Sequence, residues 1–131
     1  MKKIGVINSE LSRVISELGH TDTIVIGDCG LPIPPGVRRI DLALRRGVPG
    51  YLETLETILE EMQVERYTVT TEMEEISPEL YHATEKLLTP SQEERVTHEQ
   101  FKQMTERARA VIRTGECTPY ANVILQAGVT F

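Results

Sequence analysis

Residues 23–28 read Thr-Ile-Val-Ile-Gly-Asp, a short β-branched run that ends at a glycine and a carboxylate. β-branched side chains favour extended backbone, so this run is typical of a buried strand. Residues 27–36 continue as Gly-Asp-Cys-Gly-Leu-Pro-Ile-Pro-Pro-Gly. Three prolines fix φ and remove backbone donors, so we expect a rigid loop after the strand.

A helix is predicted just before this strand. Four apolar side chains at i, i+3, i+4 and i+7 share one helical face: Leu11, Val14, Ile15 and Leu18. Asn8–Ser9 suits the N-cap. Gly19 suits the C′ position, where a left-handed backbone is favoured, so His20 is expected just past the helix end.

Strand and helix patterns alternate along the rest of the chain. Strands are expected at 40–44, 64–70, 110–113 and from 123 to 125 or beyond, and helices at 52–62, from Ser77–Pro78 to before Pro90, and after a capping box at Thr97. This alternation predicts one layered α/β domain over residues 1–131, with a largely parallel β-sheet flanked by helices. The segment 72–94 is acidic and polar, and it is predicted to be a solvated excursion rather than a functional site.

The charge balance excludes several classes of partner. The 131 residues include 14 basic and 20 acidic side chains, for a net charge of −6. Nucleic acids and anionic membranes need clustered Lys and Arg, so neither is an expected partner. No apolar run approaches the roughly 20 residues that span a bilayer, and Met1–Asn8 lacks the apolar core of a signal peptide. We therefore expect a cytoplasmic protein.

Motifs for metal, nucleotide or disulfide chemistry are weak. The histidines stand at 20, 82 and 98, without the spacing of a metal site. Gly27 and Gly30 form no phosphate-binding loop. Cys29 and Cys117 give no disulfide framework, and Cys29 is more typical of a small, partly buried residue than of a nucleophile. The residues thus predict no metal and no cofactor.

Two histidines are placed where they could act. The carbonyl end of a helix favours a positive charge, so His20 is a candidate general acid, or else only a helix cap. His98 falls in the first turn of a helix, where a neutral imidazole is favoured. A neutral ring both accepts and donates a hydrogen bond, which suits sugar hydroxyls; the alternative is an exposed first-turn residue.

Polar side chains also follow one strand and precede another. Asp28 lies at the carboxyl end of a strand, where α/β sheets bind ligands, although it is equally suited to an Asx turn that organises Cys29 and Gly30. Tyr120 and Asn122 flank Ala121 before the last strand. Their donors, acceptors and aromatic face suit a polyol; alternatively Tyr120 only packs on the core.

Several motifs together resemble the D-ribose pyranase family, relatives of the L-fucose mutarotases. The resemblance runs nearly end to end and is weakest at 72–94. Its motifs are Asn8-Ser9-Glu10, Leu18-Gly19-His20-Thr21-Asp22-Thr23, Gly27-Asp28-Cys29-Gly30-Leu31-Pro32-Ile33-Pro34, Thr97-His98-Glu99-Gln100-Phe101-Lys102, and the run from Ala110 through Pro119-Tyr120-Ala121-Asn122 to Phe131.

This resemblance implies an isomerase of ribose catabolism. It would interconvert β-D-ribopyranose and β-D-ribofuranose without a cofactor, with His20 as proton donor. Asp28, His98 and the segment Tyr120, Ala121 and Asn122 would bind the sugar. The resemblance also implies a cytoplasmic ring-shaped homo-oligomer, a homodecamer, with sites near subunit boundaries.

Three points stay open at this level. The general base is either Asp28 or an ordered water. A non-catalytic sugar-binding or regulatory module would use the same pocket, although such a module has less need of a proton donor than an enzyme. A mutarotase for another sugar, such as fucose, would also carry these residues.

Overall fold

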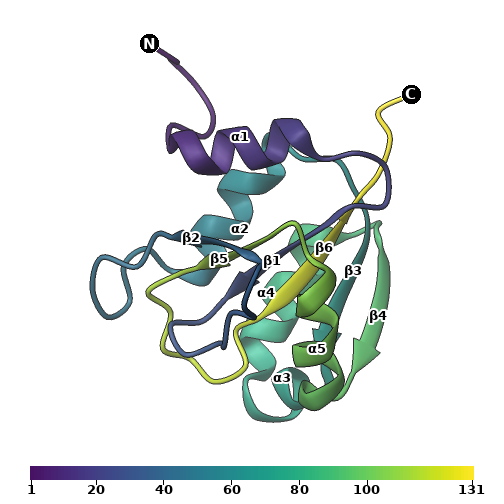
Figure 1. The fold of residues 1–131 in the computed structure, drawn as a ribbon. Helices are drawn as coiled ribbons and strands as arrows, with labels where there is room; N and C mark the ends of the chain where they lie inside the picture. The colour runs from purple at the N-terminus through teal and green to yellow at the C-terminus, as the bar shows by residue number, and fades with distance from the viewer.

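A six-stranded sheet organises the computed structural model, which describes residues 1–131 (Figure 1). The strand order is β2-β5-β1-β6-β3-β4. The strands are β1 (Thr23–Gly27), β2 (Arg38–Asp41), β3 (Val64–Thr70), β4 (Gln92–Val96), β5 (Ala110–Arg113) and β6 (Val123–Ala127). β1, β2 and β5 pair in parallel, as do β3 and β4, whereas β6 is antiparallel to both its neighbours. The largely parallel sheet is thus confirmed.

Helices cover both faces of this sheet. They are α1 (Ser9–Glu17), α2 (Tyr51–Leu59), α3 (Thr71–Ile76), α4 (Pro78–Leu88) and α5 (His98–Met104), with a 3-10 turn at Thr105–Arg107. The larger core cluster joins α1, α2, α3 and α4 to one face, whereas a smaller cluster packs Phe101 of α5 on the other. The flanking helices predicted from the sequence are therefore present.

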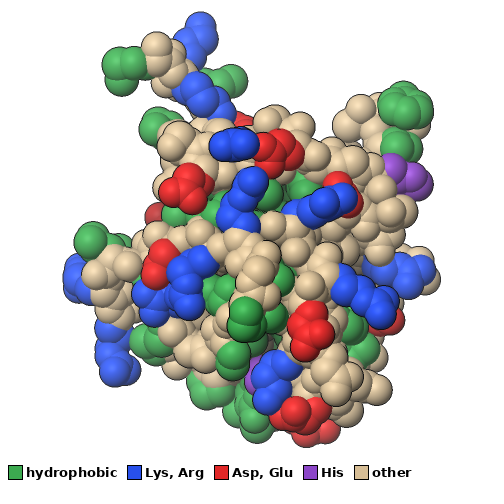
Figure 2. Space-filling view, in the orientation of Figure 1, with side chains coloured by type: hydrophobic (Ala, Val, Ile, Leu, Met, Phe, Trp, Pro, Cys, Tyr) green, Lys and Arg blue, Asp and Glu red, His purple; other side chains and the backbone are tan.

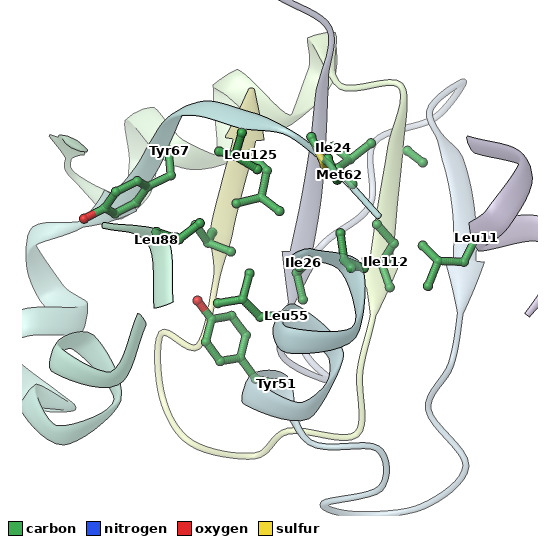
Figure 3. Close-up of a cluster of buried hydrophobic side chains, with 14 of the residues drawn as sticks. Leu11, Ile24, Ile26, Tyr51, Leu55, Met62, Tyr67, Leu88, Ile112 and Leu125 are labelled. Atoms are coloured by element: carbon green, nitrogen blue, oxygen red, sulfur yellow. The ribbon is translucent and has the colours of Figure 1, made fainter. Parts of the chain in front are cut away.

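The side chains of β1 alternate between the two clusters. Ile24 and Ile26 enter the larger one, and Val25 enters the smaller one. Figure 3 shows Tyr51 and Leu55 of α2 beside Ile26, in the middle of the larger cluster. All five are fully buried. Full burial of a Leu, Ile or Val side chain contributes about 1.5–3 kcal/mol, so this two-sided core holds β1 firmly in place.

Two predicted turns differ from the structure. Gly19 does not adopt a left-handed backbone; Thr21 does, with φ 71°. The Asp22 carboxylate accepts a hydrogen bond from Gly19 N at 2.9 Å, which closes a tight turn that moves the left-handed residue to Thr21. β2 ends at Asp41, before the predicted Leu44, because Leu44 N donates to Val48 O at 2.9 Å and turns the chain back.

The segment 72–94 is folded: the helix predicted from Ser77–Pro78 to before Pro90 is present as α4, whereas the prediction that the segment is a solvated excursion is wrong. It contains most of α3, all of α4 and the start of β4, and Met73, Tyr81 and Leu88 are buried in the larger core cluster. β4 reads Gln-Glu-Glu-Arg-Val and lies at an edge of the sheet, paired only with β3. An edge strand has one side open to solvent, so polar side chains are tolerated there.

The surface carries charges of both signs. In the view of Figure 2, blue and red side chains are interspersed and form no large single-sign field. No helix has both the length and the apolar character needed to cross a membrane.

Candidate active site

Asp28 and Asn122 lie side by side where β1 ends and β6 begins. Because β6 runs antiparallel to β1, its first residues lie beside the last residues of β1. Asp28 N donates to Asn122 Oδ1 at 2.9 Å, and Asn122 Nδ2 donates to Asp28 Oδ2 at 3.0 Å. Asn122 is fully buried. These two hydrogen bonds, one to the Asp28 backbone and one to its carboxylate, therefore fix Asp28 at the carboxyl end of β1.

The Asp28 carboxylate also organises its own loop. Its Oδ1 accepts a hydrogen bond from Gly30 N at 2.9 Å, which is the Asx turn considered from the sequence. This turn does not remove the carboxylate from the site, because each carboxylate oxygen has two acceptor positions. The half-buried Asp28 thus holds the loop and still presents lone pairs to a ligand.

Tyr120 is held in an unusual backbone conformation beside this pair. Its φ is 61°, a left-handed value that side chains other than glycine seldom adopt. Tyr120 O accepts a hydrogen bond from Asn122 N at 2.8 Å, and Ser77 Oγ donates to the preceding carbonyl, Pro119 O, at 2.7 Å. Ala121 is fully buried, so its methyl group belongs to the core. The partly buried Tyr120 ring also packs against the larger core cluster, which was the alternative considered from the sequence.

His98 comes to the site from α5. The predicted capping box is present: Thr97 Oγ1 accepts from Gln100 N, and the Gln100 side chain accepts from Thr97 N. Glu72 Oε2 accepts from His98 N at 3.0 Å. The His98 ring meets the Tyr120 ring edge-on, with 5.1 Å between centroids. The structure therefore brings His98, Tyr120, Asn122 and Asp28 together.

One ring nitrogen of His98 has no partner. Nδ1 is buried and makes no hydrogen bond within the chain. Buried polar atoms are nearly always paired, and leaving one unpaired costs about 1–3 kcal/mol. A ligand hydroxyl beside this atom would therefore find a ready partner.

His20 lies away from these four residues. It sits in the turn before β1, whereas Asp28 follows the strand. The five residues of β1, at about 3.3 Å each, separate the two ends by roughly 17 Å. His20 Nε2 donates to Glu65 Oε2 at 2.9 Å. One copy of the chain does not bring the predicted proton donor to the predicted sugar-binding residues.

Glu65 anchors His20 from β3. Its other oxygen, Oε1, accepts from Gln126 Nε2 of β6 at 2.7 Å. Hydrogen bonds from Gln126 and then from His20 hold the pKa of Glu65 below its usual value. A charged carboxylate thus orients the imidazole, as in other histidine–carboxylate pairs.

Sequence reasoning missed three residues that position this machinery: Glu65, Glu72 and Ser77. Each lies more than 20 positions from the residue it contacts, so no local motif marks it. Glu72 and Ser77 also belong to the segment that was predicted to be a solvated excursion. For Glu65, the sequence indicates only that it is a polar residue within the predicted strand at 64–70.

The donor set suits a neutral polyol. A carboxylate, an amide, an imidazole and a phenol offer both donors and acceptors for hydroxyls. No group of three or more His, Cys, Asp or Glu side chains is arranged to hold a metal ion.

Comparison with known families agrees with this chemistry. A model of the RbsD / FucU transport protein family matches residues 1–130. The chain belongs to this family.

Relatives of this RbsD / FucU chain cover its full length. A D-ribose pyranase of Laribacter hongkongensis is 58% identical over 131 residues, and each chain is covered completely. The structure of Bacillus subtilis RbsD complexed with D-ribose matches with a TM-score of 0.97 and 49% identity, again with complete coverage of both chains. A fucose mutarotase in complex with L-fucose from Streptococcus pneumoniae is more distant, with a TM-score of 0.78, 25% identity and complete coverage of both chains.

Proposed function

We propose that this RbsD / FucU family member is a D-ribose pyranase, an isomerase that interconverts β-D-ribopyranose and β-D-ribofuranose. The observation that carries this proposal is the complete match to a ribose-bound relative, at 49% identity and a TM-score of 0.97. The cluster of Asp28, His98, Tyr120 and Asn122 supports it independently, because its donors and acceptors suit sugar hydroxyls.

The reaction breaks one C–O bond of the sugar and forms another, and it needs only proton transfers from the protein. An acid protonates the ring oxygen while a base takes the proton of the anomeric hydroxyl, and the ring opens to the aldehyde. Attack by the C4 hydroxyl in place of the C5 hydroxyl then closes the five-membered ring. The uncatalysed reaction already proceeds, so a positioned acid that contributes about 10²–10⁴-fold is sufficient.

His20 is our candidate for the acid. Its Nε2–H is bound to Glu65, which leaves Nδ1 to pass a proton to the sugar. Asp28, His98, Tyr120 and Asn122 would hold the hydroxyls, and Ala121 would contribute only backbone groups. The base is Asp28 or an ordered water held by it.

The separation between His20 and Asp28 leads us to propose that the site forms between copies of the chain. A head-to-tail contact would bring the His20 turn of one copy to the Asp28 end of the next, and such contacts close into rings. Ala127, the last residue of β6, accepts a hydrogen bond from Thr21 N in the turn that carries His20. The exposed side chains of Val129 and Phe131 follow directly after it. These apolar side chains support an interface there, in a cytoplasmic decamer.

Light scattering tests the assembly, and a monomer in solution would contradict it. The reaction itself is tested by NMR saturation transfer between the anomeric protons of pyranose and furanose D-ribose, with L-fucose measured in parallel. We expect faster exchange for ribose. Enhanced exchange for fucose alone would indicate a mutarotase of another sugar, and ribose binding without enhanced exchange would indicate a binding module.

A further inference from the structure

The two cysteines of the chain meet next to the candidate site. Cys29 and Cys117 are 88 positions apart, yet their Sγ atoms lie 3.5 Å from each other. Both residues are exposed and neither is in a disulfide. Cys29 N donates to Glu116 O at 2.9 Å, so the two backbones are held together independently of the sulfur atoms.

We propose that Cys29 and Cys117 form a modification site, a dithiol that a low-molecular-weight disulfide oxidises to a reversible bond within one chain. A disulfide has an S–S distance of about 2.05 Å, so the two sulfur atoms must approach by about 1.5 Å. Cys29 lies in an irregular loop that is exposed at this point, and Cys117 lies in the segment between β5 and β6. Such loops can make this movement without disturbing the core.

The chemistry balances in two exchange steps. The thiolate of one cysteine attacks the reagent disulfide, forms a mixed disulfide and releases one reagent thiolate. The second protein thiolate then attacks the protein sulfur of that mixed disulfide and releases the other reagent thiolate. The two cysteine protons end on the two released thiols; the protein is oxidised by two electrons and the reagent disulfide is reduced.

The surroundings favour the protonated thiol of Cys29 over its thiolate at neutral pH. The hydrogen bond with Cys117, followed by burial and the nearby Asp28 carboxylate, raises the pKa of the Cys29 thiol. Arg113, whose Nη1 lies 3.5 Å from Cys29 O, and Glu116 are the other charged groups at this position. A thiol is less reactive than its thiolate, so oxidation is expected to be slow at pH 7 and faster at higher pH.

Oxidation would act on the candidate site through the two loops. Cys29 directly follows Asp28, whose carboxylate holds Gly30 N. Cys117 directly precedes the segment Thr118-Pro119-Tyr120. The Glu116 carboxylate, on the other side of Cys117, accepts hydrogen bonds from Thr118 N and Oγ1. Drawing the sulfur atoms together displaces Asp28 relative to Tyr120, and displacements near 1 Å can lower a rate by up to about 10²-fold. This consequence for activity rests on the proposed function, whereas the dithiol itself does not.

The test treats the assembled wild-type protein with oxidised glutathione at pH 8, followed by alkylation, intact mass and peptide mapping. We expect the loss of two hydrogen atoms, no alkylated thiol, and a cross-linked peptide pair within one chain. Cys29→Ser and Cys117→Ser should instead each retain a glutathione adduct. Stable glutathione adducts on the wild type, cross-links between chains, or unreacted thiols would overturn the proposal.

A second measurement follows ribose exchange by the same samples. The exchange rate should fall at least about fivefold on oxidation and recover on reduction, and the rate of the double variant Cys29→Ser/Cys117→Ser, which has no thiol, should not respond to the reagent. An internal disulfide that leaves the rate unchanged would overturn the coupling to the site. If the reduced wild-type protein shows no exchange, the proposed function fails, while the mass measurement still decides the dithiol.

Discussion

His20 and Glu65 form a hydrogen-bonded pair, with Nε2 donating to Oε2 at 2.9 Å, at the end of β1 opposite Asp28. Glu65 is in turn held by Gln126 at 2.7 Å. The imidazole therefore has a fixed orientation although it is half exposed. This pair is the basis of the first prediction.

Glu65→Gln should slow ribose exchange about tenfold, less than the 10²–10⁴-fold expected on removing the acid itself. The amide still forms hydrogen bonds but lacks the charge that orients and stabilises a protonated ring. Saturation-transfer NMR measures the effect, with Glu60→Gln as an exposed control on the same protein. A Glu65→Gln rate equal to that of the control would show that the pair has no role in the reaction.

Tyr120→Gly should be more stable than Tyr120→Ala by about 1 kcal/mol, because an L side chain at φ 61° is strained and glycine is not. Both variants lose the ring, so their difference isolates the backbone effect. Urea denaturation of the two proteins gives the free energies. A more stable alanine variant would mean that this turn is not left-handed in solution.

Gly115→Ala should lower the free energy of unfolding by about 1–3 kcal/mol. A Cβ at this position would lie 2.5 Å from Arg45 O and from Val48 N and O, and backbone atoms cannot move aside as a flexible side chain can. Gly19→Ala is the control, since the nearest atom would be 3.6 Å away. Equal urea midpoints for the two variants would contradict this close approach.

Stability should decline in acid. The Arg113 guanidinium bound to Asp41 holds the pKa of that carboxyl below its usual value, and the Gly19 N–H, together with Arg109, does the same for Asp22. A carboxyl whose folded pKa is depressed stabilises the protein above its unfolded pKa and loses this contribution as pH falls through the folded value. Urea midpoints should therefore hold down to about pH 5 and decrease below about pH 4.

Asp41→Asn provides the control for this pH dependence. It lacks one of the titrating groups, so its urea midpoint should vary less with pH than that of the wild type. Wild-type urea midpoints that rise as the pH is lowered from about 5 to about 3 would contradict the stabilising role of these two carboxylates.

The sequence predicted most of the fold because the signals were local. Asn8, Thr97 and the β-branched run at 64–70 mark their elements by residue type and spacing, and each is found as expected. β4 was missed because an edge strand of charged residues lacks an apolar pattern. The sequence predicts the left-handed residue at Gly19, but Thr21 adopts this backbone instead, because the Asp22 side chain accepts from Gly19 N and closes the turn.

The candidate site was less accessible to sequence reasoning. Asp28, His98, Tyr120 and Asn122 were identified from position and residue type, and the structure brings them together. The distance of His20 from these residues follows from the fold: His20 precedes β1, whereas Asp28 follows it. Glu65 and Glu72 act across long separations in the sequence, which only the folded chain reveals.

A subunit-mixing experiment tests most directly whether His20 of one copy acts on ribose held by another. His20→Ala and Asp28→Asn are each expected to lose exchange activity. Asparagine at position 28 cannot accept from both Gly30 N and Asn122 Nδ2 through two oxygens. When the two variants are denatured together, mixed 1:1 and refolded, random assembly should give about one quarter of the wild-type exchange rate, because one interface in four pairs two intact halves. No recovery in assembled mixed oligomers would contradict a site shared between copies.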